Sequence, residues 1–254
     1  KPNRNEALEY YRRVAEKFQL NINLFEEVRQ LKQLGVNNFE IETVKTTYQA
    51  KNVIIATGFY DVPVMMNISG EELPKVRHYY QDPHLYAFSK VVVIGANNSA
   101  IDVALETYRK GADVTLVIRG SEIGSYVKYW VRPDIENRIK EGEIKAYFNS
   151  EVVSISENKV EIKMPERNIS VENDFVLAMT GYQPNFALLK KLGVELDENQ
   201  SPKHNPETME TNKKGLYLAG VVCGGMDTHK WFIENSRVHA EQIIKHILDK
   251  QLES

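Results

Sequence analysis

Cysteine is nearly absent from this sequence of 254 residues, in which Cys223 is the only one. A single cysteine excludes an intrachain disulfide, a paired-thiol redox motif within these residues and a zinc site built of thiolates. An excess of charge of one sign is also missing, because 32 lysines and arginines nearly balance 35 aspartates and glutamates, for a net charge of −3. We therefore expect neither a nucleic-acid partner nor an anionic membrane surface.

No hydrophobic run is long enough to cross a bilayer. The most apolar stretch, residues 216–226, is interrupted by glycines and is shorter than the roughly 18 residues that a membrane span requires. Hydrophobic residues nevertheless make up 42% of the chain and charged residues 26%, as in ordinary globular proteins. These values predict a soluble, cytoplasmic protein.

The first part of the chain reads as a helix followed by short strands. Apolar side chains spaced by three and four predict a helix over residues 5–18 with one buried stripe. Short β segments are expected at residues 22–28, 39–43 and 47–50. The apolar run 51–58 predicts a fully buried strand that ends at a Thr-Gly pair. Because an amphipathic pattern is already running at the first residue, which is not Met, we expect further sequence upstream.

The middle of the chain contains a strand-turn-helix-strand unit. Residues 59–89 contain three prolines and read as a connection, since each proline removes a backbone donor. Strands are then predicted at 91–94 and 114–118, flanking a helix over 99–110 that Gly111 closes.

Two similar segments punctuate the sequence. Alternation predicts a three-stranded meander over residues 151–171, followed by a buried strand and VLAMTG at 176–181. That segment repeats VIIATG at 53–58, and such an internal repeat suggests two similar nucleotide-binding domains. A strand over 215–219 and a terminal helix over 228–249 complete the prediction.

The strongest motif is GANNSA, which follows a strand and opens a helix, where a dinucleotide fingerprint has to lie. Gly95 permits the tight turn, and the small Ala100 lets the helix pack closely against the strands. Asn97 stands at a glycine position, where we expect it to tolerate positive φ. Backbone amides at the helix N-terminus would point at the phosphates. The predicted dinucleotide-binding residues are Gly95, Ala96, Asn97, Asn98, Ser99 and Ala100.

The residue after the second strand predicts which dinucleotide is bound. An acidic residue there would bind the ribose hydroxyls of NAD, whereas this chain has Arg119, which suits the 2′-phosphate of NADPH. Lys128 and Arg132 follow and could assist. The alternative is a nucleotide-free strand-turn-helix with a surface arginine.

Together these motifs resemble the flavoproteins with two dinucleotide-binding domains, which include thioredoxin reductases. GANNSAID, LAMTGYQPN and FIENSRVHAE are similar to the YpdA family of bacillithiol disulfide reductases. The resemblance implies an α/β fold of two Rossmann-like, three-layer domains. The NADPH domain, residues 72–182, is inserted into an FAD domain made of residues 1–71 and 183–254.

The resemblance also implies FAD and NADPH as cofactors, bacillithiol disulfide as a small-molecule substrate, and a homo-oligomer. The FAD-binding residues carried over from it are Ala56, Thr57, Gly58, Gly220 and Val221. Glu234, early in the terminal helix, could contact the flavin or a partner subunit, or lie on a solvated helix face. Val221 departs from thioredoxin reductases, which have Asp there. The first βαβ unit and the candidate redox cysteine of such families are expected before Lys1, so no catalytic residue is predicted in this chain.

Several residues have a simpler interpretation beside a functional one. Cys223 follows a strand that leads to the flavin, but a lone cysteine most often packs as a small apolar side chain. His239 and His246 read as ordinary helix residues, and no metal site is predicted. The aromatic residues of the connection could face substrate or pack a domain junction, namely Tyr79, Tyr80, Tyr86 and Phe88.

Two alternatives to the disulfide reductase remain. One is a ferredoxin or flavodoxin NADP reductase of the same fold, which also lacks paired cysteines. The other is a non-catalytic NADPH-binding fragment.

Overall fold

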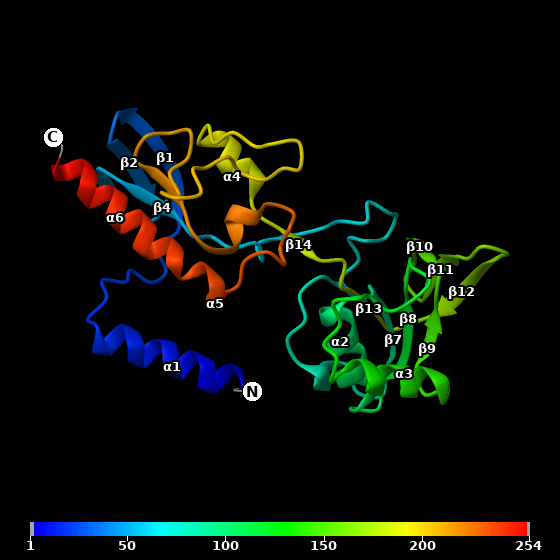
Figure 1. Ribbon diagram of the computed structural model, residues 1–254. Helices are drawn as coiled ribbons and strands as arrows, with labels where there is room; N and C mark the ends of the chain where they lie inside the picture. The colour runs from blue at the N-terminus through cyan, green and yellow to red at the C-terminus, as the bar shows by residue number, and fades with distance from the viewer. Residues whose placement is uncertain (1–2, 253–254) are drawn as a thin grey trace. The chain divides into compact units, whose positions relative to one another are not determined.

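The computed structural model describes residues 3–252, which form two compact units (Figure 1). The first unit comprises the residues up to Ala56 together with those from Phe186 onward, and the second comprises Thr57–Asn185. The predicted NADPH domain, 72–182, lies inside the second unit. Residues 57–71, which the prediction placed with the FAD domain, also belong to the second unit.

The second unit is built on a five-stranded sheet in the order β6-β13-β7-β8-β9, in which every pairing is parallel. Its strands are β6 (Val76–Arg77), β7 (Lys90–Ile94), β8 (Asp113–Val117), β9 (Lys145–Tyr147) and β13 (Phe175–Ala178). After the first residue of each, the central strands β7, β8 and β13 are buried along their length, because both faces of the sheet are covered.

Helices cover one face of this sheet and a meander covers the other. On the first face, α2 (Asn98–Tyr108) and α3 (Arg132–Lys140) pack against the sheet through one continuous apolar cluster. On the second face, the antiparallel strands β10 (Glu151–Ile155), β11 (Lys159–Lys163) and β12 (Asn168–Glu172) pack on the alternate residues of the same strands. These are three layers around one sheet (Figure 1), as the fold prediction required.

The first unit is built on two small sheets. Strands β1 (Val28–Gly35), β2 (Asn38–Thr43) and β3 (Thr47–Ala50) form an antiparallel meander, while β4 (Val53–Ile55) and β15 (Leu216–Leu218) form a parallel pair. The helices of this unit are α1 (Arg4–Lys17), α4 (Phe186–Lys191), α5 (Ile233–Ser236) and α6 (Val238–Leu252). Its core gathers around the fully buried Phe39, Tyr217 and Ile243.

Four predictions for the first unit are wrong in detail. The strand predicted to be fully buried is β4, but its Ile54 is 46% exposed. Helix α1 is present, but none of its residues is buried, so its apolar stripe is not covered by the described part of the chain. The first strand is β1, whereas residues 22–27 are not strand. The predicted terminal helix is divided at Arg237 into α5 and α6.

The connection 59–89 contains elements that its prolines concealed. Two of them are the short strands β5 (Val62–Pro63), which pairs with β14 (Tyr182–Gln183), and β6. The third is the 3₁₀ helix η1 (Pro83–Tyr86). Sequence reasoning also missed α3, β9 and α4, although a proline stands in the first turn of α3, where its fixed φ favours a helix start.

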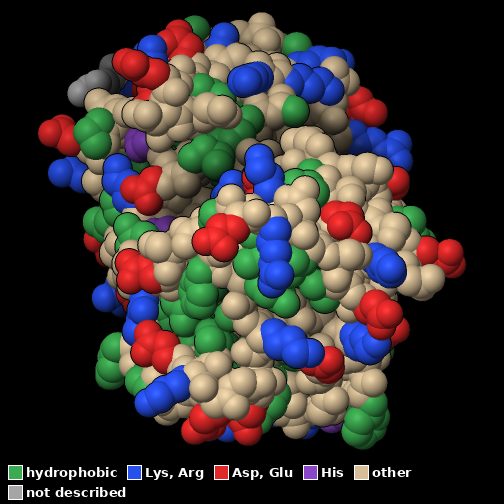
Figure 2. Space-filling view, turned by 90° about the vertical axis from the view of Figure 1, so that its right-hand side faces the viewer, with side chains coloured by type: hydrophobic (Ala, Val, Ile, Leu, Met, Phe, Trp, Pro, Cys, Tyr) green, Lys and Arg blue, Asp and Glu red, His purple; other side chains and the backbone are tan. Residues whose placement is uncertain are grey.

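None of the described helices has the length and apolarity needed to span a membrane. On the face drawn in Figure 2, acidic and basic side chains are interspersed. This distribution agrees with the near balance of charges in the sequence.

Candidate functional site

The glycine-motif turn joins β7 to α2 and has no room for a side chain at Gly95. This residue has φ +136°, and a Cβ there would lie 2.5 Å from the carbonyl oxygen of Met179 and 3.0 Å from the Cβ of Ala100. Its amide donates to the carbonyl of Val117 at 3.1 Å, which ties the turn to the end of β8. Only glycine satisfies both the dihedral angle and the contact.

A cavity of about 410 Å³ opens beside this turn within the second unit. Its walls come from the glycine turn, the carboxyl ends of β7, β8 and β13, and the segment after β5. Parallel sheets bind ligands at this edge, outside the carboxyl ends of the strands. The predicted residues that line it are Gly95, Ala96, Asn97, Ser99, Ala100 and Arg119. Ser150, Glu151 and Thr180 also line it but are not among the predicted binding residues, although Thr180 lies in the VLAMTG segment.

Asn97 does not take the left-handed conformation expected of it. It is the N-cap residue of α2, with φ −99° and ψ −173°, and its side chain makes no capping hydrogen bond. The expectation was wrong because Gly95 supplies the positive φ of this turn, whereas an N-cap residue takes extended dihedral angles. The Asn97 side chain instead points toward Gly124: a Cβ at Gly124 would lie 2.0 Å from the Asn97 Oδ1 atom.

Asn98 and Lys128 are absent from the cavity lining and make other contacts. The Asn98 side chain donates to the carbonyl of Tyr126 at 2.8 Å and accepts from the amide of Lys128 at 3.0 Å. The Lys128 Nζ atom lies 2.5 Å from a carboxylate oxygen of Asp102. The positive charge of Lys128 is thus already paired with Asp102, and its role in binding phosphate stays a prediction.

Arg119 is the one basic residue and Glu151 the one acidic residue among those lining the cavity. Arg119 is exposed at the end of β8, and no described residue forms an ion pair or hydrogen bond with it. A guanidinium without a carboxylate partner is available to bind an anion through paired, charge-assisted hydrogen bonds. The cavity residues therefore fit a dinucleotide that carries a phosphate near Arg119.

Five of the six predicted FAD-binding residues follow β4 or β15. In the first unit these two strands run parallel, and the amide of Ala219 donates to the carbonyl of Ile55 at 3.0 Å. Ala56 ends this unit, and Thr57 and Gly58 begin the second. Gly58 and Gly220 have φ values of +72° and +78°, and a Cβ at either would meet no atom within 4 Å. Open space in front of a glycine lets a ligand approach the backbone, so both residues fit the predicted role.

Gly220 and Val221 open the 3₁₀ helix η2 (Gly220–Gly224), which His239 holds in place. The amide of Gly220 donates to the Nδ1 atom of His239 at 3.1 Å, and His239 is 1% exposed. Burial lowers the pKa of His239, so the ring stays neutral and can accept this hydrogen bond. The sequence presented His239 as an ordinary helix residue, and nothing in its local pattern revealed this contact.

Cys223 lies in the same 3₁₀ helix but lacks the surroundings of a reactive thiol. It is 2% exposed, its sulfur lies 4.0 Å from Nδ1 of His239, and burial raises its pKa to about 12. A thiol that stays protonated at neutral pH is a poor nucleophile, which favours the packing interpretation. Glu234 is exposed in the first turn of α5, and its role at the flavin stays a prediction.

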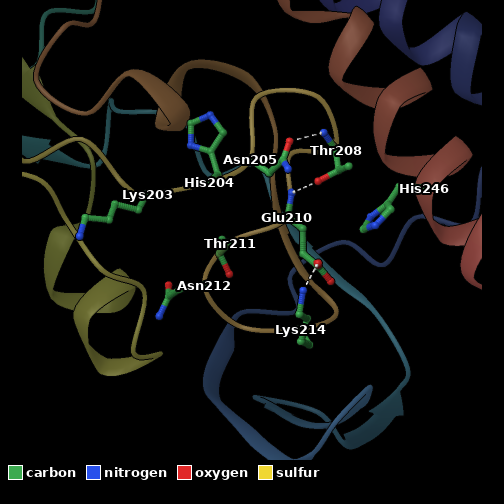
Figure 3. Close-up of a pocket in the computed structure, with 9 residues that line it drawn as sticks. All are labelled: Lys203, His204, Asn205, Thr208, Glu210, Thr211, Asn212, Lys214 and His246. Carbon is green, nitrogen blue, oxygen red and sulfur yellow. Dashed lines mark hydrogen bonds and ion pairs between the residues drawn. The ribbon is translucent and has the colours of Figure 1, made fainter.

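A second cavity, of about 380 Å³, lies in the first unit, and none of the predicted site residues lines it (Figure 3). Its buried carboxylate belongs to Glu210, which accepts from the Gly215 amide at 2.8 Å and from the ammonium groups of Lys250 at 2.6 Å and Lys214 at 3.3 Å. Burial opposes ionisation of Glu210, but these three contacts together lower its pKa. The carboxylate thus fastens the turn before β15 to α6, which is a structural role.

The remaining candidate residues fall into packing positions or onto the surface. Tyr86 is 4% exposed and stacks on Tyr80, whereas Phe88 is 91% exposed. Tyr79 stacks on Tyr182 with ring centroids 5.3 Å apart. In residues 3–252, no group of three or more His, Cys, Asp and Glu side chains is placed to hold a metal ion.

Comparison with known proteins assigns the family. The family model described as pyridine nucleotide-disulphide oxidoreductase matches residues 1–220. The chain belongs to this family. The assignment confirms the predicted class of enzyme, an NADPH-dependent flavoprotein disulfide oxidoreductase, and its cofactors FAD and NADPH.

Individual relatives of this oxidoreductase agree with the predicted resemblance. The Bacilliredoxin reductase Bdr of Bacillus subtilis (strain 168) is 44% identical over 253 residues, which cover 99% of this chain and 78% of that protein. The solved structure of Bacillithiol Disulfide Reductase Bdr (YpdA) from Bacillus cereus matches with a TM-score of 0.95 and 39% identity, over 98% of this chain and 79% of that one. The T. acidophilum thioredoxin reductase matches with a TM-score of 0.71 and 25% identity, over 86% of this chain and 72% of that one.

Proposed function

We propose that this oxidoreductase uses NADPH to reduce bacillithiol disulfide. The reaction would convert NADPH, a proton and the disulfide into NADP⁺ and two thiols. FAD, when bound, would supply the route by which electrons pass from the nicotinamide to the disulfide. The observation that carries the NADPH half is the cavity at the carboxyl ends of β7 and β8, with Gly95 at its turn and Arg119 on its wall.

We further propose that residues 72–182 bind NADPH and that residues 1–71 and 183–254 contribute to FAD binding. In the first part, the backbone amides at the start of α2 would hold the pyrophosphate, because the positive end of the helix dipole favours an anion. For FAD binding, the open space in front of the backbone at Gly58 and Gly220 supports the assignment.

The identity of the acceptor rests on the relatives. Two solved relatives, 39% identical to this chain, carry the name bacillithiol disulfide reductase, and the curated relative at 44% identity is named for bacilliredoxin. More distant relatives, about a quarter identical, are named ferredoxin–NADP reductase. Electron delivery to a protein is therefore the second candidate function.

Steady-state NADPH oxidation by the FAD-loaded protein distinguishes these acceptors. We expect turnover with bacillithiol disulfide and much less with glutathione disulfide or ferredoxin. Turnover that requires ferredoxin or a flavodoxin, with none on bacillithiol disulfide, would favour the second candidate function.

We also propose that the protein is a homo-oligomer located in the cytoplasm. Light scattering tests the oligomeric state, and cell fractionation tests the location.

A further inference from the structure

Residues 120–131, which we name the clamp loop, connect the end of β8 to α3 and begin directly after Arg119. The loop has little regular secondary structure, and loops of this kind are usually the mobile parts of a domain. This one is fastened to the glycine turn by side-chain and backbone hydrogen bonds.

The side chain of Asn98 makes the central fastening. Its amide nitrogen donates to the carbonyl of Tyr126 at 2.8 Å, and its carbonyl oxygen accepts from the amide of Lys128 at 3.0 Å. One carboxamide thus satisfies a backbone acceptor and a backbone donor two residues apart, which neither Asp nor Ala can do. This use of both amide groups explains why the position carries Asn.

Gly124 makes the second fastening. Its amide donates to the carbonyl of Ala96 at 2.9 Å. A Cβ at Gly124 would lie 2.0 Å from Oδ1 of Asn97 and 3.0 Å from the carbonyl oxygen of Ala96. A side chain at this position would therefore displace the Asn97 side chain and crowd the carbonyl of Ala96, so the loop lies in close contact with the glycine turn.

Further contacts hold the loop on either side of these two. The amide of Asn149 donates to the carbonyl of Gly120 at 2.9 Å, beside the cavity. Beyond Gly124, Lys128 pairs with Asp102. Ile123 and Val127 are buried in the apolar core with exposures of 4% and 5%. Hydrogen bonds, an ion pair and buried side chains thus join the loop to the glycine turn and to the core of the second unit.

We propose that Asn98 is a positioning residue, which holds the clamp loop on the glycine turn so that Arg119 selects a 2′-phosphorylated adenine nucleotide. Asn98 acts through Arg119 and does not contact the 2′-phosphate. The inference rests on the proposed NADPH site but needs neither FAD nor a disulfide. Its failure can therefore be distinguished from failure of the proposed reaction.

The test is a double-mutant cycle in the full chain, with 2′,5′-ADP and 5′-ADP as probes in calorimetric titrations. We expect Asn98→Ala to weaken the binding of 2′,5′-ADP about tenfold, which corresponds to about 1.4 kcal/mol. The affinity for 5′-ADP should change much less. We expect Gly124→Ala to have the same selective effect, since its Cβ displaces the loop by a different route. In the Arg119→Ala background, Asn98→Ala should cause no further loss.

Asn168→Ala is the matched control, because Asn168 is exposed at the start of β12. It should leave both affinities unchanged. Hydrogen exchange adds a readout that needs no nucleotide: Asn98→Ala should speed exchange of the Gly124 and Lys128 amides. Equal loss for both nucleotides, additive effects of Asn98→Ala and Arg119→Ala, unchanged exchange, or no preference of the unaltered chain for 2′,5′-ADP would each overturn the proposal.

Discussion

The backbone amide of Gly220 donates to Nδ1 of His239 at 3.1 Å, across 19 residues of sequence. The acceptor atom is available only while the imidazole is neutral, because a protonated ring carries hydrogen on both nitrogens. The position of the 3₁₀ helix η2 therefore depends on the protonation state of one buried histidine.

This contact predicts a loss of stability in mild acid. Burial lowers the pKa of His239 below its ordinary value of 6.5, so the unfolded chain binds a proton that the folded chain does not. The free energy of unfolding should fall as the pH falls below about 6.5, until the folded-state pKa is reached. Electrostatic repulsion from His204 lowers the pKa of His239 further. Denaturant titrations at several pH values measure this slope.

The matched variant for this prediction is His239→Asn, whose side-chain oxygen can still accept from the Gly220 amide but does not titrate near neutral pH. It should reduce the slope between pH 7 and pH 5. A slope identical to that of the unaltered protein would show that other groups cause the loss of stability.

Gly95→Ala should disrupt the dinucleotide turn. Its Cβ would lie 2.5 Å from the carbonyl oxygen of Met179, at φ +136°. We expect the free energy of unfolding to fall by about 2 kcal/mol and nucleotide binding to be lost. Thermal unfolding followed by circular dichroism measures the first effect, and titration with 2′,5′-ADP measures the second. Gly142→Ala is the control, because Gly142 also has positive φ, +75°, but open space at its Cβ position. A Gly95→Ala protein that binds as well as the control variant would contradict the account of the turn.

Glu210→Gln should destabilise the first unit by about 2 kcal/mol, because the buried carboxylate accepts two charged hydrogen bonds that an amide cannot replace in strength. The lowered pKa of Glu210 also means that its contribution is present above pH 4.5 and is lost as the pH falls to the folded-state value. Denaturant unfolding at neutral pH measures the effect against Glu207→Gln, which removes an exposed carboxylate from the same segment. Equal stabilities of the two variants would rule out the fastening role.

Cys223 should be unreactive in the folded protein. It is 2% exposed with a pKa raised to about 12 by burial, so a thiol reagent such as dithiobisnitrobenzoate should react only after denaturation. Since the sequence contains one cysteine, the denatured chain should then give one thiol. Fast reaction in the native protein would restore the redox interpretation of this residue.

The sequence contained enough to place the dinucleotide turn. Strand β7, Gly95, Ala100 and the helix that follows have local signals, because apolar runs, glycine and helix periodicity each reflect short-range physics. The prediction for Asn97 is wrong because Gly95 supplies the positive φ of the turn, which leaves Asn97 as the extended N-cap residue of α2.

Other features depend on contacts between distant residues and leave no local pattern. Strand β6 has two residues and exists because β13 pairs with it. The pairing of Lys128 with Asp102 crosses 26 residues, and that of Gly220 with His239 joins a turn to a helix. Short-range sequence patterns do not reveal such pairs, because the two residues of each pair are far apart along the chain.

The measurement that tests the central claim most directly is the ratio of the dissociation constants of NADPH and NADH for the unaltered chain and for Arg119→Gln. We predict that the unaltered chain binds NADPH at least about tenfold more tightly than NADH. Arg119→Gln should remove most of this difference by weakening the binding of NADPH and leaving that of NADH unchanged. Equal binding of the two nucleotides by the unaltered chain, or a preference that survives in Arg119→Gln, would contradict the assignment of this cavity as the NADPH site.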